Sequence, residues 1–274
     1  MPDWLKVLQL CSQRMREEVL TLFGSKEAEL GFGRGAGGDV IKKIDLVAEN
    51  ALIQTLTELN VSCTLVSEET GMKEIGPKPS NWYVTADPLD GTTNALRGLP
   101  FVAISLAGSK RPCLGDVEVA LVSDLFHNVT YTARRNGKAF RNGEEIQPSQ
   151  TSLLEESVIG VDFNTFKARE LVSKIIGVLE RTRHLRHFGA NALELCYVAD
   201  GTIDAFIDLR GKLRVTDIAA AYLVLREAGG IMVTPEGNEL NVPLDASQRV
   251  SFIATANPVI YGKIRRLLAL ASAT

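Results

Sequence analysis

The sequence predicts an α+β fold in which layers of β-sheet are covered by α-helices. Three observations lead to this prediction. An amphipathic helical pattern opens the chain, a series of short apolar or β-branched runs follows it, and helix-like and strand-like stretches alternate in the second half. The 274 residues suffice for one large domain or two medium ones, and a chain of this length needs no disulfides to be stable.

Two helices and a glycine-rich loop are predicted in the N-terminal part. Apolar side chains recur at helical spacing over about residues 3–23, and Gly24 supplies a stop signal. Residues 31–38 are mostly glycine and carry too little side chain to pack, so we expect a mobile loop there. Helical spacing resumes from about Asp45 to Leu59.

A series of short strands follows. Strands are predicted at 61–67, 82–86, 101–107, 117–122 and 129–133. Two Asn-Gly pairs within Arg135–Gly143 predict tight turns and a hairpin. The polar stretch near 143–156 is a candidate boundary between two lobes of a single domain, about 1–150 and about 151–274.

Strands and helices alternate in the second lobe. Strands are predicted at 157–161, 204–209, 231–234 and 252–256, and helices near 165–180, 190–199 and 217–228. Gly229 and Gly230 end the last of these helices, and Pro258 suits the first turn of a C-terminal helix.

Composition excludes several classes of function. Hydrophobic residues make up 45% and charged residues 23%, which is typical of a soluble globular protein. The net charge of −3 gives no basic excess for nucleic acid and no basic block for a membrane surface. The N-terminal residues are charged too early for a signal peptide, no apolar stretch is long enough to span a bilayer, and no two of the four cysteines are close in sequence. We therefore expect a cytoplasmic protein with reduced thiols.

The most informative segment joins an apolar strand to a stiff turn. The run ADPLDGTTN (86–94) places Asp87 and Asp90 around Pro88, which resists continuing the strand, and before Gly91, which permits a tight turn. Mg²⁺ is commonly held by a few carboxylates together with water and phosphate. Taken alone, the segment is equally well explained as an ordinary polar turn.

Two further acidic positions have simple explanations of their own. Glu68 and Glu69 follow the strand at 61–67, where a solvated loop is the simpler interpretation. Asp217 precedes a helical pattern and is predicted to be its N-cap. A carboxylate at a helix N-terminus can also contact a metal, and the helix end itself attracts phosphate.

The order and spacing of these segments resemble the inositol monophosphatase superfamily, which includes fructose-1,6-bisphosphatases and phosphoadenosine phosphatases. The matching runs are SEET (67–70), DPLDGTTN (87–94) and TDIAAAYLVLREAGG (216–230), with Asp45 upstream and FGANALELCYVADG (188–201) between them. The run CYVADGTIDA (196–205) is most similar to archaeal-type enzymes with both fructose-1,6-bisphosphatase and inositol-1-monophosphatase activity. The resemblance covers nearly the whole chain.

This resemblance implies a layered αβαβα sandwich and a Mg²⁺-dependent phosphomonoesterase. Its substrate would be a small sugar or polyol phosphate, fructose 1,6-bisphosphate or inositol-1-phosphate, hydrolysed by metal-activated water. Two or three Mg²⁺ ions, or Mn²⁺ in their place, would clamp the attacking and leaving oxygens. The resemblance also suggests a homodimer or homotetramer.

Roles carry over by resemblance to particular residues. Glu68, Asp87 and the Leu89 carbonyl match a first metal site, and Asp87, Asp90 and Asp217 match a second. The remaining matches are Asp45 near a third ion, Thr92 orienting the attacking water with Glu68, and the amides of Gly91 and Thr92 on phosphate oxygens. Thr93, Gly189, Ala190, Asn191, Arg210 and Lys212 complete the predicted substrate contacts.

The chain departs from the family pattern at two positions. Thr216 stands where many members have Trp, and Arg210 stands where many animal inositol monophosphatases have Glu, which weakens strict inositol selectivity. Arg210, Lys212 and Arg214 alternate, so in an extended segment they would share one face. One or two of them could reach a phosphate that is not cleaved; local ion pairs, for example with Asp208, are the alternative.

Three other functions were weighed. A dinucleotide-binding oxidoreductase is disfavoured, because the glycines at 31–38 follow a charged stretch instead of a strand. A non-catalytic phosphosugar-binding protein would be supported by a missing carboxylate or threonine, and every such position is filled. A phosphatase for 3′-phosphoadenosine 5′-phosphate or NADP is the alternative within the enzyme class, although the sequence identifies no slot for the adenine.

Overall fold

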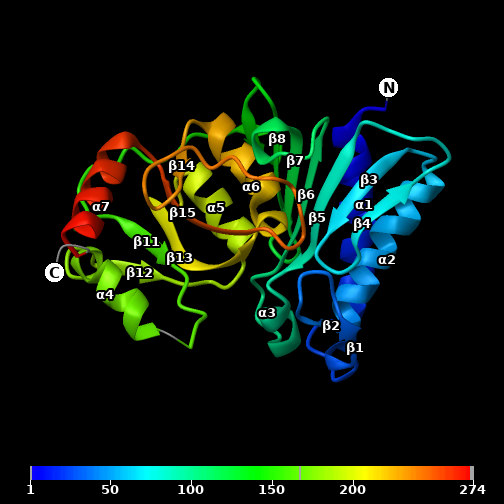
Figure 1. Cartoon of the computed structure of the whole chain (residues 1–274), viewed down its shortest axis with the longest axis horizontal. Coiled ribbons are helices and arrows are strands. Elements are labelled where there is room, and N and C mark those ends of the chain that lie inside the picture. Colours follow the sequence, from blue (N-terminus) through cyan, green and yellow to red (C-terminus); the bar gives the residue numbers. More distant parts are fainter. Residues whose placement is uncertain (1, 167, 272–274) are drawn as a thin grey trace.

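The computed structural model describes residues 2–166 and 168–271 and has five layers, as Figure 1 shows. Residue 167, inside the predicted helix 165–180, lies outside the described residues. The layers are a helix pair, an eight-stranded sheet, a second helix pair, a five-stranded sheet and a third helix pair. This arrangement confirms the predicted αβαβα sandwich.

The first two layers are built by the predicted N-terminal lobe, residues up to about 150. Helices α1 (Trp4–Leu22) and α2 (Lys43–Glu58) pack against each other and on one face of the large sheet. Its strands, in spatial order, are β10 (Glu144–Glu145), β9 (Ala139–Arg141), β8 (Val129–Arg134), β7 (Val117–Asp124), β6 (Ala103–Ser109), β5 (Tyr83–Asp90), β3 (Cys63–Ser67) and β4 (Gly71–Ile75). In this sheet, only β3 and β5 are parallel neighbours, so both of these strands end at the same edge of the sheet.

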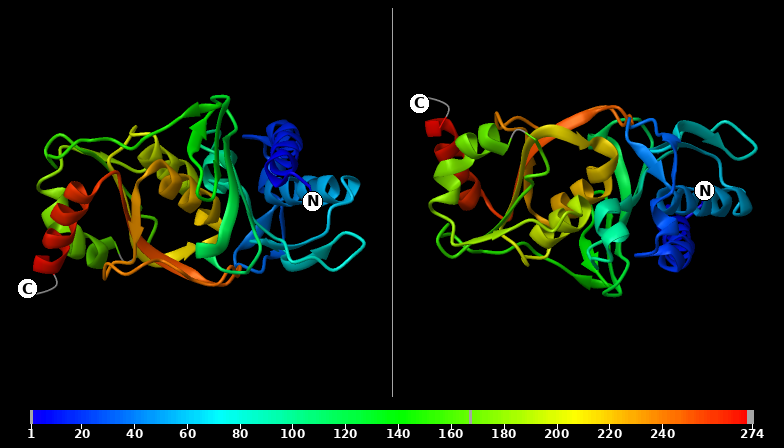
Figure 2. Two further views of the ribbon diagram at one scale, coloured as in Figure 1. Left: turned by 90° about the horizontal axis from the view of Figure 1, so that it is seen from above. Right: turned by 90° about the horizontal axis from the view of Figure 1, so that it is seen from below.

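The other layers come from the C-terminal lobe. Helices α5 (Asn191–Ala199) and α6 (Val215–Ala228) lie between the two sheets, as the views in Figure 2 show. The strands of the small sheet, in order, are β12 (His184–Arg186), β11 (Val158–Val161), β13 (Ala205–Arg214), β15 (Arg249–Thr255) and β14 (Ile231–Val233). Helices α4 (Ala168–Leu179) and α7 (Pro258–Ala271) cover its outer face.

The buried apolar side chains of the described residues form three cores, one under each helix pair. The central core combines residues of both sheets, such as Tyr131 on β8 and Phe206 on β13, with α5 and α6. Helix α6 is buried from Val215 to Leu225 and is rich in alanine, which lets both sheets approach it closely. The start of α6, where Asp217 lies, is therefore held firmly between the lobes.

Two Asn-Gly turns are confirmed. Asn136 and Asn142, with φ of 56° and 50°, occupy the left-handed region in the turns that connect β8, β9 and β10. Five further short elements were not predicted: β4, β12, the helix α3 (Thr92–Arg97), and the 3₁₀ turns η1 (Glu27–Glu29) and η2 (Leu114–Asp116). Within the described ranges, no helix has both the length and the apolarity needed to cross a membrane.

The glycine-rich segment differs from its prediction. Instead of a loop without packing, it forms a two-stranded antiparallel ribbon of β1 (Gly31–Arg34) and β2 (Val40–Lys42). The turn between them lies on other parts of the chain: the amides of Ala36 and Gly37 donate to the carbonyls of Glu69 and Glu68, both at 2.9 Å. Backbone hydrogen bonds, which need no side chains, provide this packing.

Strand β5 also differs from its prediction, because it continues through Pro88 to Asp90. Its pairing with β6 shifts register between Asp87 and Asp90, and this irregularity accommodates a residue without an amide donor. The two aspartates thus leave the sheet at the point where its regular hydrogen bonding is interrupted.

Candidate metal centre

A cavity of about 650 Å³ lies where the two lobes meet. Its walls are the ends of β3 and β5, the first turn of α3, the start of α5, the β13–α6 junction and the β1–β2 ribbon. Most of the predicted site residues line it: Asp45, Glu68, Asp87, Leu89, Asp90, Gly91, Thr92, Thr93, Gly189, Asn191, Arg210, Lys212 and Asp217.

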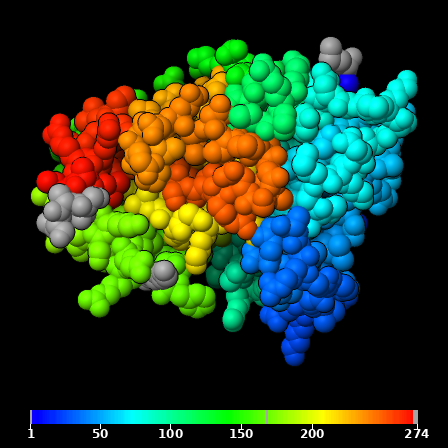
Figure 3. All heavy atoms as spheres, viewed as in Figure 1, coloured from blue at the N-terminus to red at the C-terminus, as the bar shows by residue number. Residues whose placement is uncertain are grey.

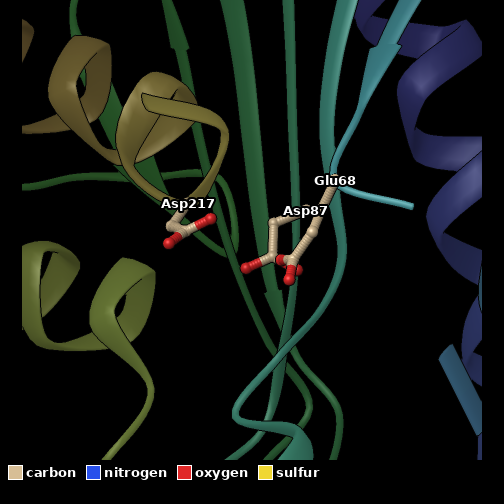
Figure 4. A group of neighbouring side chains, drawn as sticks. All are labelled: Glu68, Asp87 and Asp217. Carbon is tan, nitrogen blue, oxygen red and sulfur yellow. The ribbon is translucent and has the colours of Figure 1, made fainter. Parts of the chain in front are cut away.

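Three carboxylates converge at the base of this cavity. One oxygen each from Glu68, Asp87 and Asp217 lies within 4.8 Å of the others, and Figure 4 shows the three side chains directed into a common space. Glu68 follows β3, Asp87 lies on β5 and Asp217 lies on α6. Two adjacent strands and a helix from the other lobe therefore build the cluster.

The predicted N-cap role of Asp217 is wrong by three positions. Helix α6 begins at Val215, its N-cap is Arg214, and Asp217 is the third helical residue. The Asp217 carboxylate accepts from the Arg214 amide at 3.0 Å and from the Thr216 hydroxyl at 3.0 Å. These two donors fix the orientation of the carboxylate toward the cavity.

Asp90 is held differently from the other carboxylates. Its two oxygens accept hydrogen bonds from the amides of Asn191 at 2.9 Å and Ala192 at 2.7 Å, at the start of α5. A helix N-terminus carries partial positive charge, so this contact stabilises the ionised form. Asp90 thereby ties β5 of the first lobe to α5 of the second, while each oxygen keeps a further lone pair.

A second hydrogen-bonded group lies beside the cluster. The Thr92 hydroxyl lies 2.9 Å from Asp45 Oδ1 and 3.2 Å from the Leu89 carbonyl. The other oxygen of Asp45 accepts from the Lys42 amide at 3.0 Å, at the start of α2. Helix α2 therefore positions Asp45, and Asp45 positions the threonine.

The turn that leads into α3 requires glycine. Gly91 has a φ of 94°, and a Cβ there would lie 2.9 Å from the Phe101 carbonyl oxygen and 3.2 Å from that of Gly189. After this turn the first amides of α3, including those of Thr92 and Thr93, have no carbonyl partner within the helix. They can bind the oxygens of a phosphate.

The opposite wall is formed by the Gly189–Asn191 segment. Asn94 Nδ2 donates to the carbonyls of Phe101 at 2.8 Å and Phe188 at 2.7 Å, which draws this wall toward α3. Ala190 is buried and is the N-cap of α5. The residue Asn191 lines the cavity, but its Oδ1 atom is buried and has no hydrogen-bond partner in the protein.

Burial and mutual repulsion raise the pKa values of the clustered carboxyls. The pKa of Asp90 is raised to about 8, mainly by burial and then by the charge of Asp217. Burial raises the pKa of Asp45 to about 6. Burial and the charge of Asp217 also raise the pKa values of Glu68 and Asp87 well above their usual range, with the Arg214 guanidinium opposing the rise at Glu68.

These groups fit a divalent magnesium or manganese ion. Such ions prefer oxygen ligands, and the cluster offers carboxylate oxygens at close spacing, while Leu89 lines the same cavity. Burial and the mutual repulsion of these carboxylates, which raise their pKa values, both disfavour their charged forms when no cation is bound. A bound cation would supply the missing charge, so the donor set matches the predicted chemistry.

The three basic residues Arg210, Lys212 and Arg214 all line the cavity, as alternation along the segment predicted, but they have different partners. Gly211, with a φ of 63°, interrupts the extended backbone between Arg210 and Lys212. The Arg210 guanidinium is buried in ion pairs at 2.5 Å with both Asp162 and Asp208, so the local pairing left open by the sequence is present. The Lys212 ammonium lies 5.9 Å from the centre of the exposed Phe166 ring.

Two site residues had no sequence signal. Asp39 and Asp162 line the cavity, and Asp162 pairs with Arg210, but neither belongs to a motif used for prediction. Arg214 was considered only as one of three alternating cations. Glu194 is fully buried and accepts from the amides of Phe188 and Gly189, which fixes the wall opposite α3. Its position inside the CYVADG-containing run could have pointed to it.

Comparisons with known proteins identify the family and the fold to which the chain is similar. A profile of the inositol monophosphatase family matches residues 5–271. The fructose-1,6-bisphosphatase/inositol-1-monophosphatase of Methanothermobacter thermautotrophicus is 36% identical over 274 residues, covering 97% of this chain and 96% of that protein. The bifunctional NADP phosphatase/NAD kinase of Methanococcus maripaludis is 34% identical over 279 residues, covering 96% of this chain and 48% of that protein. A crystal structure of an inositol monophosphatase-fructose 1,6-bisphosphatase has a TM-score of 0.85 at 28% identity, covering 97% of this chain and 100% of that one.

Proposed function

The chain belongs to the inositol monophosphatase family of phosphatases, as its motifs indicated, and from this premise we propose that it is a Mg²⁺-dependent phosphatase of a small phosphorylated sugar or polyol. The observation that carries the proposal is the close approach of Glu68, Asp87 and Asp217 beside the free amides that open α3. A phosphate monoester is an anion that repels nucleophiles, so its hydrolysis needs concentrated positive charge. The carboxylates would collect that charge where the phosphate binds.

The proposed metal ligands divide between the two lobes. A first ion would be held by Glu68, Asp87 and the Leu89 carbonyl, and a second by Asp87, Asp90 and Asp217. Asp45 would help to hold a third. Such ions, when bound, neutralise the phosphate and make a coordinated water more acidic.

The chain's own groups then position the reactants. The Thr92 hydroxyl, placed by Asp45 and the Leu89 carbonyl, would orient the attacking water together with Glu68. The amides of Gly91, Thr92 and Thr93 would hold the phosphate oxygens.

The leaving sugar or polyol would lie against the opposite wall. There Gly189 and Asn191 line the cavity, while Ala190, one of the predicted contacts, is buried and supports this wall as the N-cap of α5. A distal phosphate, as in fructose 1,6-bisphosphate, would be met by Lys212, because the Arg210 guanidinium is engaged with two buried aspartates. We propose fructose 1,6-bisphosphate and inositol-1-phosphate as substrates on this basis.

A nucleotide substrate is the second candidate. The exposed ring of Phe166, next to the cavity residue Lys212, offers a flat apolar face for a nucleobase and a cation for its phosphate. The similarity to a bifunctional NADP phosphatase/NAD kinase also supports a nucleotide substrate. NADP and 3′-phosphoadenosine 5′-phosphate are therefore included among the test substrates. The family resemblance also leads us to propose a homodimer or homotetramer, which sedimentation equilibrium would test.

The test is initial rates of phosphate release from fructose 1,6-bisphosphate, inositol-1-phosphate, NADP and 3′-phosphoadenosine 5′-phosphate, with Mg²⁺ and with excess EDTA. We expect release from the first two substrates with Mg²⁺ and none with EDTA. Asp217→Asn keeps an oxygen that can accept from the Arg214 amide but removes a charge from the cluster, so kcat should fall at least about 100-fold. Full turnover in EDTA, or near wild-type rates of a folded Asp217→Asn variant, would refute the metal-dependent mechanism.

A further inference from the structure

Arg214 contacts three parts of the cavity that come from different regions of the chain. It is the last residue of β13, and its backbone amide donates to Asp217. Its Nη1 atom lies 2.8 Å from Glu68 Oε1, and its Nη2 atom pairs with the Asp39 carboxylate on the turn of the β1–β2 ribbon. The side chain is only 11% exposed, so it spans the seam between the lobes inside the protein.

The turn that Arg214 reaches is held over Glu68. The Gly37 amide donates to the Glu68 carbonyl and the Ala36 amide to the Glu69 carbonyl, so the turn lies on the backbone that carries the carboxylate. From the second lobe, Arg249 donates to the Gly37 carbonyl. Figure 3 shows the blue atoms of the ribbon lying against orange atoms of the second lobe.

The glycines in this turn permit the approach. A Cβ at Gly37 would lie 2.3 Å from Arg214 Nε, and a Cβ at Gly35 would lie 2.5 Å from Glu69 Oε2. Any larger residue at 37 would displace the guanidinium. The need for glycine at positions 35 and 37 therefore follows from close contact with Glu69 and Arg214.

We propose that Arg214 is a positioning residue that couples the position of the 35–39 turn over Glu68 to the orientation of the Glu68 carboxylate. This inference rests on the proposed metal-dependent function. The guanidinium holds Glu68 Oε1, which fixes the plane of a carboxylate that contributes one oxygen to the cluster with Asp87 and Asp217. The same guanidinium binds Asp39. The turn is therefore held against Glu68 when Arg214 also holds the Glu68 carboxylate.

The chemistry favours arginine for this task. A planar guanidinium presents several donors in a fixed fork, so it can bind two carboxylates at once, whereas a lysine ammonium is a single flexible point charge. Groups that hold a metal ligand from behind typically change metal affinity or activity by about 10–100-fold when they are replaced. Arg249 touches the same turn but has no contact with Glu68 among those described, which makes it a matched control.

The experiment compares Arg214→Lys with Arg249→Lys, since both substitutions keep the local charge. Hydrogen exchange is followed on a peptide covering residues 31–40, with and without saturating Mg²⁺, and Mn²⁺ binding is measured by electron paramagnetic resonance. In the wild type, Mg²⁺ should slow exchange of the Ala36 and Gly37 amides about tenfold. In Arg249→Lys, exchange should be faster throughout but the Mg²⁺-dependent slowing should persist.

In Arg214→Lys the Mg²⁺-dependent slowing should disappear, and Mn²⁺ affinity should weaken about tenfold. Retention of the slowing in Arg214→Lys, or its loss in both variants, would overturn the coupling. Neither measurement depends on turnover. A wild-type protein that hydrolyses its substrate but shows no coupling would remove this inference alone, whereas a protein that binds no Mn²⁺ would remove the proposed function.

Discussion

Replacing Gly91 by alanine probes the turn on which the proposed phosphate site depends. Gly91 adopts a left-handed conformation, with φ of 94°, between Asp90 and the first residue of α3. Gly98, at the other end of the same short helix, is also left-handed, with φ of 71°. The two positions differ in their surroundings, because no atom lies within 4 Å of a Cβ at Gly98, whereas a Cβ at Gly91 meets two backbone carbonyl oxygens.

The expected losses of stability follow from this difference. The left-handed conformation costs an alanine about 1–2 kcal/mol at either position. At Gly91 the overlap with the Phe101 oxygen at 2.9 Å adds about 1–3 kcal/mol, because a backbone carbonyl cannot move aside as a flexible side chain can. With about 2 °C of melting temperature for each kcal/mol in a chain of this size, Gly98→Ala should lower the Tm by about 2–4 °C and Gly91→Ala by about 4–10 °C.

The assay combines thermal unfolding with initial rates in Mg²⁺. Displacement of the turn would move Asp90 and the Thr92 amide, so kcat of Gly91→Ala should fall about 100-fold, while Gly98→Ala stays within about threefold of the wild type. Equal Tm shifts for both variants, together with wild-type turnover by Gly91→Ala, would show that the close contact has no role in the site.

Two other predictions concern pH and specificity. Because burial raises the pKa values of Asp45 and Asp90 to about 6 and about 8, the folded protein without metal binds more protons than the unfolded chain, so its Tm in EDTA should fall as pH rises from about 4 to about 8. Mg²⁺ should flatten this dependence, and a flat curve in EDTA would contradict the assigned crowding of carboxylates. Lys212→Ala should lower kcat/KM for fructose 1,6-bisphosphate at least about tenfold more than for inositol-1-phosphate, a difference near 1.4 kcal/mol, and equal losses would exclude a distal-phosphate contact. Arg210→Ala should instead lower both equally and destabilise the fold by about 3–5 kcal/mol, because Asp162 and Asp208 lose their buried partner; unchanged thermal stability would contradict that role.

The layers of the fold could be predicted because each long element carries its own signal. The spacing of apolar residues marked α1, and the Asn-Gly pairs marked the turns around β9. The ribbon of β1 and β2 could not be predicted, because it is held by backbone contacts to Glu68 and Glu69, which leave no pattern in its own residues. The end of α6 before Gly229 was predicted correctly, but its start was missed by two residues, because Val215 and Thr216 are buried and β-branched and resemble the end of a strand.

The site itself was predicted unevenly. Motif order placed Glu68, Asp87 and Asp217 together although they are far apart in sequence, and the structure brings their oxygens within 4.8 Å. The pairing of Arg210 was not decided by sequence, because alternation along a strand indicates a shared face but not the partner of each side chain. Arg214 was read as one of three equivalent cations, and only the spatial arrangement shows its contacts with both lobes.

The confinement of α6 between two sheets has a consequence for how such an enzyme can diversify. Asp217 lies at the start of a helix whose first eleven residues are buried, so a change there disturbs both cores at once. Phe166 and Lys212 are exposed at the rim, so these two positions can accept substitutions at little cost to folding. Substitutions at the rim would thus change the substrate, while the residues of the hydrolytic centre are kept.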